Sequence, residues 1–173
     1  MKDVSVGSEL SKKLHKEFLA ESDRGCAVLT VCLIEETLGA LFEKVVPTKD
    51  VSARHFMPPG RLRQGLESAI ALGLVTDPTA SNIRLILRVR NTFAHKLLAG
   101  LTFESPEVRA HVMKMQLPNL DGMSEISRKE IQDVSRQRYM HILSHALADM
   151  NRVSHIAKPF PIYPALPAYS VEV

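Results

Sequence analysis

Residues 78–98 read PTASNIRLILRVRNTFAHKLL and form the most regular apolar pattern in the chain. Apolar side chains recur there at intervals of three and four residues, the spacing of one face of an α-helix. Asp77 and Pro78 supply an N-cap and a first helical residue, and Gly100 supplies a stop. The predicted buried face consists of Ile83, Ile86, Leu87, Phe93, Ala94 and Leu97. The stretch therefore predicts a long amphipathic helix.

Arg90 interrupts this predicted apolar face, because it follows Ile83 by seven residues, close to two helical turns. A guanidinium keeps its charge in a protein, so it is not buried without a carboxylate, a carbonyl or an anionic ligand. Glu35 lies at the margin of a second predicted helix that begins at Asp23. We therefore expect Arg90 to form a buried structural ion pair, with Glu35 as first partner and Asp23 as second.

Four polar residues form a row beside this face: Arg84, Arg88, Asn91 and His95. Spacings of three and four residues place side chains on one side of a helix. Such a row could bind the phosphates of nucleic acid or another anion. His95 is the member that titrates near neutral pH and could act as general base or acid. The alternative is a solvated row of arginines, with His95 only ending the helix near its C-terminal dipole.

The rest of the chain is also helical in pattern, and aromatic residues make up only 5% of its 173 residues. Helices are predicted to begin near Ser8, Asp23, Leu62, Asp77, Ser105 and Ser127. The helix from Asp23 is predicted to bury Ala27, Val31, Ile34, Leu38, Leu41 and Val45. The last helix is predicted to be capped by Ser127 together with Glu130. One side of it carries Ile131, Ser135, Ile142, Ala146, Val153 and Ile156. We predict an all-α, single-domain bundle of about six helices over residues 1–157.

Residues 158–173 differ from the bundle, because prolines alternate with apolar residues and charge is almost absent. This composition favours an extended proline-rich tail over a helix. Its apolar side chains suggest that the tail packs on its own domain or on a second subunit, and we prefer packing on a dimer partner.

Charge and cysteine usage bound the class of protein. The formal net charge of +3 permits binding to polyanions without requiring it. The longest nearly apolar run, residues 26–34, is shorter than the roughly 20 residues of a membrane-spanning helix. Cys26 and Cys32 lie roughly 9 Å apart along one predicted helix, too far for a disulfide, and are expected to be buried reduced thiols. We expect a soluble cytoplasmic protein that does not bind membranes.

No cofactor or metal is expected from the motifs. His141 and His145 have the spacing of a helical metal pair but lack an evident third ligand, so a satisfied or surface pair is the preferred interpretation. The sequence contains no glycine-rich phosphate loop.

Four blocks carry a resemblance to a known family: ESDRGCAV at residues 21–28, ALGLV at 71–75, IRLILRVRNTFAH at 83–95 and LTFESPEV at 101–108. In order and spacing they resemble the MltR-like family, named for the mannitol operon repressor. The resemblance implies a dimeric, all-helical bacterial regulator of transcription. Because no helix-turn-helix or zinc finger is evident, we expect a non-enzymatic homodimer that acts through a protein partner, with direct RNA or DNA binding left open.

Arg90, Asn91 and His95 also resemble the Arg-x4-His motif of the HEPN superfamily of helical dimers, many of which are metal-independent ribonucleases. The resemblance implies that Arg90 stabilises a phosphate, Asn91 orients it and His95 moves the proton of a ribose hydroxyl. A HEPN-like endoribonuclease or RNA-binding protein is therefore the alternative function.

Overall fold

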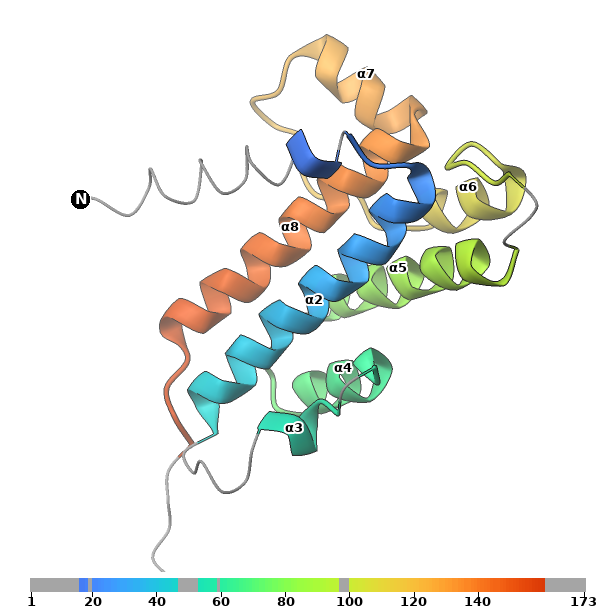
Figure 1. Ribbon diagram of the computed structural model, residues 1–173. Helices are drawn as coiled ribbons and strands as arrows, with labels where there is room; N and C mark the ends of the chain where they lie inside the picture. The colour runs from blue at the N-terminus through green and yellow to red at the C-terminus, as the bar shows by residue number, and fades with distance from the viewer. Residues whose placement is uncertain (1–15, 19, 47–52, 59, 97–99, 161–173) are drawn as a thin grey trace, which may run out of the picture.

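The computed structural model describes residues 16–18, 20–46, 53–58, 60–96 and 100–160 (Figure 1). Within these residues all regular structure is helical, which confirms the predicted all-α class. Of the predicted first helix from Ser8, only residues 16–18 and 20 are described, and they are helical; the tail beyond Phe160 lies outside the described residues. The helices are α2 (Asp23–Val45), α3 (Ala53–Phe56), α4 (Leu62–Ala71), α5 (Asp77–His95), α6 (Pro106–Met113), α7 (Glu125–Asp133) and α8 (Ser135–Ile156).

Helix α2 runs through the middle of the bundle and packs against α4, α5 and α8 (Figure 1). Its N-cap is Ser22, whose side chain accepts the N–H of Gly25 at 3.0 Å, whereas the predicted cap, Asp23, is in the first turn. All six residues predicted to be buried on this helix are buried. By length and composition α2 could also cross a membrane, which its short apolar run had not indicated, but a core helix meets the same criterion.

Helices α4 and α5 are joined by a turn that the sequence places correctly. Gly73 has φ +67°, and its N–H donates to the carbonyl of Ile70 while that of Leu74 donates to Ala69. These bonds satisfy the last carbonyls of α4. The start of α5 is attached to α8, because the hydroxyls of Thr76 and Thr79 donate to Oδ2 of Asp149 at 2.9 and 2.8 Å.

The buried face of α5 differs from the predicted one. Ile83, Ile86 and Phe93 are buried as predicted, but Val89 is buried as well, Leu87 and Ala94 are only half-buried, and Leu97 lies outside the described residues. Arg90 is exposed, so its predicted burial is wrong. At 100° per residue it lies about 60° around the helix from Phe93. Packing selects the side of α5 that carries Val89, and this choice turns Arg90 outward.

Three aromatic rings join α5 to the segment before α6 and to α8. Phe93 meets Phe103 edge to face at a centroid distance of 5.4 Å, and Phe103 lies 4.8 Å from Tyr139. All three residues are at most 1% exposed, so this contact is in the core. The buried amide of Asn82 adds a polar anchor, because it exchanges two hydrogen bonds with the backbone of Gln116.

The last predicted helix is two helices. Ser124, not Ser127, caps α7 by accepting the N–H of Ser127, and the chain is extended at Val134 (φ −97°, ψ 112°). Oε1 of Glu104 accepts the N–H of Ser135 at 2.7 Å and so caps α8 from a distant segment. Ile156, predicted to face the core, is 72% exposed. Beyond α8 the N–H of Phe160 donates to the carbonyl of Val45, which returns the chain to the end of α2.

Candidate functional site

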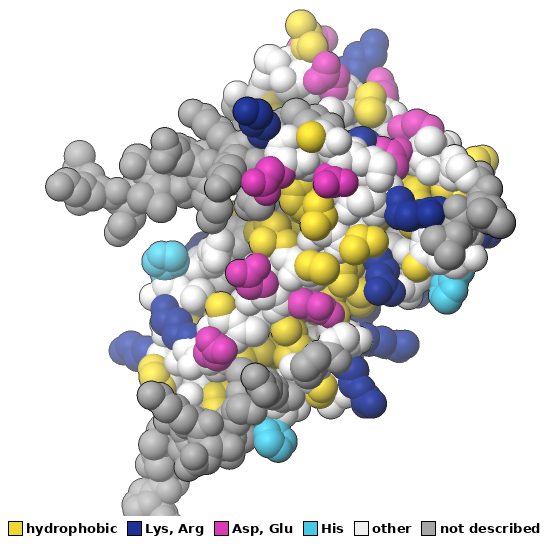
Figure 2. All heavy atoms as spheres, in the orientation of Figure 1, with side chains coloured by type: hydrophobic (Ala, Val, Ile, Leu, Met, Phe, Trp, Pro, Cys, Tyr) yellow, Lys and Arg dark blue, Asp and Glu magenta, His cyan; other side chains and the backbone are white. Residues whose placement is uncertain are grey.

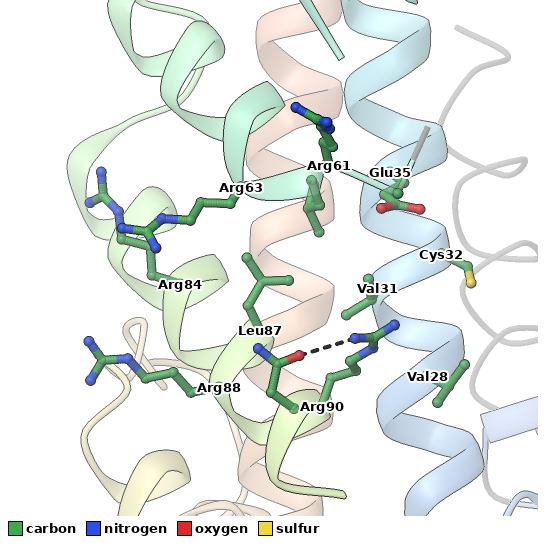
Figure 3. A pocket seen from close by; sticks show the side chains of 13 residues that line it. Val28, Val31, Cys32, Glu35, Arg61, Arg63, Arg84, Leu87, Arg88 and Arg90 are labelled. Atoms are coloured by element: carbon green, nitrogen blue, oxygen red, sulfur yellow. Dashed lines mark hydrogen bonds between the residues drawn. The ribbon is translucent and has the colours of Figure 1, made fainter. Parts of the chain in front are cut away.

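A pocket of about 430 Å³ opens between α2, the start of α4 and α5 (Figure 3). Helix α2 contributes Val28, Val31, Cys32 and Glu35, the start of α4 contributes Gly60, Arg61, Leu62 and Arg63, and α5 contributes Arg84, Leu87, Arg88, Arg90 and Asn91. Five arginines thus face one carboxylate. The pocket is strongly basic although the whole chain has a formal charge of only +3.

Most of these guanidinium groups have no carboxylate partner. Arg84 is the exception, because its Nε and Nη2 bind both oxygens of Glu67 at 3.0–3.2 Å. Nη1 of Arg90 donates to Oδ1 of Asn91 at 3.1 Å. In the part of the chain that the structure describes, the guanidinium groups of the remaining three arginines of the pocket, Arg61, Arg63 and Arg88, form no hydrogen bond or ion pair.

One arginine of the pocket, Arg88, also lies close to His111 on α6. Burial, and then the nearby Arg88 guanidinium, lower the pKa of His111. The start of α4 adds to the positive field of the pocket, since its N-cap, Arg61, makes no side-chain capping bond. The first N–H groups of a helix lack intrahelical partners and form the positive end of its dipole. Gly60, with φ +72°, makes the turn that brings this end to the pocket.

The predicted ion pair of Arg90 with Glu35 or Asp23 is not formed. Within the described residues Arg90 makes no ion pair, although half-buried Glu35 lines the same pocket. Asp23 instead binds Arg136 at 2.8 Å and accepts the backbone N–H of Phe103 at 2.8 Å. Arg136, the partner of Asp23, belongs to α8, so the positions of residues around α5 could not reveal this ion pair.

The predicted anion-binding row is divided by the structure. Arg84, Arg88 and Asn91 line the pocket, but His95 is the exposed last residue of α5 and is not among the lining residues. Sequence reasoning did not single out Arg61 and Arg63 as site residues. Their signal was the Gly-Arg-Leu-Arg stretch at residues 60–63, and only the fold brings it beside α5.

The cysteines differ from each other in environment. Cys26 is buried, and burial raises the pKa of its thiol to about 11. Cys32 is exposed and lines the pocket, so the prediction that both thiols are buried is wrong for Cys32. Both are free cysteines.

The histidine pair on α8 offers no metal site of three ligands. His141 and His145 have ring centroids 4.7 Å apart, and burial together with His145 lowers the pKa of His141. Among the described residues, no group of three or more His, Cys, Asp or Glu side chains could hold a metal ion.

The fold and the pocket define a helical-bundle protein with a basic pocket. Comparison with family models, with curated proteins and with solved structures finds no match for this chain.

Proposed function

We propose that this chain is a cytoplasmic bacterial regulatory protein of the mannitol-repressor-like kind, which acts as a helical homodimer through contacts with a protein partner and not by catalysis. The observation that carries this proposal is an apolar surface on α2, the central helix. It consists of Val28, Leu29 and Cys32, which we call the α2 patch. The role in repressing a sugar-alcohol operon rests on the resemblance of the four sequence blocks.

The α2 patch has the composition of an association surface. Val28 is 41% and Leu29 39% exposed, on a helix whose other side forms the core. In Figure 2, hydrophobic side chains gather over α2 in the middle of the face shown, surrounded by acidic and basic side chains. An apolar centre with a charged rim is typical of protein interfaces. His95, the group suited to proton transfer, lies outside the pocket, which favours binding over catalysis.

Leu29→Asp should convert a dimer into a monomer. Association would bury the introduced carboxylate, and an unpaired buried charge costs several kcal/mol, so the dimer dissociation constant should rise at least about 100-fold. Sedimentation velocity at micromolar concentrations measures this change. The matched control is Ile126→Asp, because Ile126 is 75% exposed on α7, outside the α2 patch.

The regulatory role is tested with the same two variants in the bacterium that encodes the chain. Deletion of the gene should raise transcription of a sugar-alcohol operon, and the wild type and Ile126→Asp, but not Leu29→Asp, should restore repression. A monomeric wild type, or full repression by Leu29→Asp, would contradict the proposal.

The HEPN-like endoribonuclease is a second candidate, favoured by the accessibility of its motif. Arg90 and His95 are both exposed on the last two turns of α5, and Asn91 accepts a hydrogen bond from Arg90. The three side chains are therefore open to RNA or to the same residues of a second protomer. No step of this chemistry requires a bound metal.

Incubation with structured RNA in EDTA separates the two candidates. A regulatory protein should leave the RNA intact, and His95→Ala should behave as the wild type does. The control is His55→Ala, which alters an exposed histidine on α3. Cleavage by the wild type and by His55→Ala that is at least about 100-fold slower in His95→Ala would establish the ribonuclease and reject the non-catalytic proposal.

A further inference from the structure

We propose that the arginine-lined pocket binds a small phosphate ester whose organic part carries hydroxyl or amino groups, the chemistry shared by nucleotides and sugar phosphates. This assignment adds a ligand site to the proposed regulator. Val28 and Cys32 of the α2 patch also line the pocket, so the site adjoins the proposed dimer surface, but all of its lining residues belong to one chain. Four features of the pocket support it: positive charge without a carboxylate partner, arginines from two elements, an apolar wall and a single carboxylate.

The positive charge of the pocket lacks internal compensation. The guanidinium groups of Arg61, Arg63 and Arg88 have no hydrogen bond or ion pair within the described residues, and a guanidinium cannot lose its proton in a protein. Like charges that line one pocket repel each other in the free protein. A phosphate dianion removes this repulsion and accepts hydrogen bonds from the planar guanidinium forks.

The arginines come from two sides of the pocket. Figure 3 shows Arg61 and Arg63 on the α4 side, with Arg88 and Arg90 on α5, and the side chain of Arg90 reaches toward α2. The uncapped N-terminus of α4 lies on the same side as Arg61. A phosphate between these elements could therefore accept hydrogen bonds from guanidinium groups of both helices. Arg88 extends away from α2 in Figure 3, so the arginines surround the pocket from several directions. The fold is needed to bring them to one pocket, since residues 61 and 90 are distant in sequence.

The remaining wall is suited to the organic part of a ligand. Val31, Leu62 and Leu87 supply apolar surface, and half-buried Glu35 has no hydrogen-bond or ion-pair partner within the described residues. A carboxylate only accepts hydrogen bonds when ionised, so Glu35 would select hydroxyl or amino donors and disfavour a bare phosphate.

The dimensions of the site favour a small molecule over a polynucleotide. A volume of about 430 Å³ is within the range of small-ligand pockets. A bound strand would need a basic groove that continues beyond the pocket. His95, which could have extended the row along α5, lies outside it.

Calorimetric titration at low salt tests the site with four probes: inorganic phosphate, pyrophosphate, adenosine triphosphate and a hexose phosphate. Arg61→Ala and Arg88→Ala should each weaken binding of the preferred ester about 10-fold or more, because each removes a charged hydrogen-bond donor. Lys129→Ala is the matched control, since it removes one exposed positive charge on α7. Added salt should weaken binding in the wild type. Equal losses in Lys129→Ala and in the two arginine variants would reject the pocket as the site.

Glu35→Gln should change the affinity for two probes in opposite directions. It should tighten pyrophosphate binding, because a repelling charge is removed, and weaken the preferred ester, because an ionised acceptor is lost. Tighter binding of both would overturn the role given to Glu35. The identity of the preferred ester, nucleotide or hexose phosphate, is read from the wild-type titrations.

Two further measurements distinguish this pocket from a nucleic-acid surface and from a site shared between two protomers. Binding to a single-stranded RNA oligonucleotide without binding to either small ester would overturn the proposal in favour of a nucleic-acid surface. Leu29→Asp, which alters a residue outside the pocket lining, should retain ester binding even where it abolishes the dimer. Loss of ester binding in this variant at all protein concentrations would reject a site complete within one chain.

Discussion

Phe93→Ala should lower the free energy of unfolding by about 3–5 kcal/mol, the range for removing a fully buried phenylalanine. Phe93 is 0% exposed and packs edge to face on Phe103, which in turn contacts Tyr139. The truncation therefore leaves a cavity where α5, α8 and the segment before α6 meet. Urea denaturation followed by circular dichroism measures the loss.

Arg90→Ala is the matched control from the same six-residue motif. Arg90 is exposed and bonds only to its neighbour Asn91 among the described residues, so the change should stay within about 0.5 kcal/mol. A loss of several kcal/mol would instead indicate a structural, buried arginine. A small effect of Phe93→Ala would contradict the packing of α5.

Asp23→Ala should be the second large effect, a loss of about 2–4 kcal/mol. One carboxylate oxygen binds Arg136 and the other accepts the N–H of Phe103, both at 2.8 Å. Arg136 also donates to the carbonyls of Phe18 and Glu21 at 2.6 and 2.7 Å. Removing the carboxylate leaves a partly buried guanidinium and a backbone donor without their partner. Chemical denaturation again provides the measurement.

Asp77→Ala is the control that separates the contacts of Asp23 with Arg136 and Phe103 from its effect on the helix dipole. Both aspartates are in the first turn of a helix, where a carboxylate stabilises the helix dipole by about 0.3–1 kcal/mol. Asp77 is exposed and has no ion pair among the described residues. Equal losses in the two variants would show that the Asp23 contacts contribute little beyond the dipole term.

The Phe93 and Arg90 variants divide the motif at residues 90–95 by role. Phe93 packs in the core, whereas Arg90 and Asn91 line the pocket. His95 is the last residue of α5 and is exposed. Substitutions of Arg61 and Arg88 should leave the fold intact because both side chains are exposed. Binding and cleavage assays on these variants therefore report on ligand contacts and not on unfolding.

Most helices were predictable because their signals are local. Ser105 with Pro106 marks the start of α6, Gly73 ends α4, and the apolar spacing of α2 defines its core face. Each signal acts through backbone geometry or through side chains within one or two turns. The all-helical class follows from the sum of such signals.

Contacts between distant segments determined the features that the apolar periodicity of the sequence did not specify. The apolar pattern of α5 predicted a face that includes Arg90, whereas its packing on Phe103 and Tyr139 buries the face with Val89 and Phe93 and exposes Arg90. A cap from Glu104 makes α8 begin at Ser135. Likewise, Arg61 and Arg63 line the same pocket as Arg88 only because α4 packs beside α5. Periodicity specifies which residues share a helix face, but the direction of that face depends on partners elsewhere in the chain.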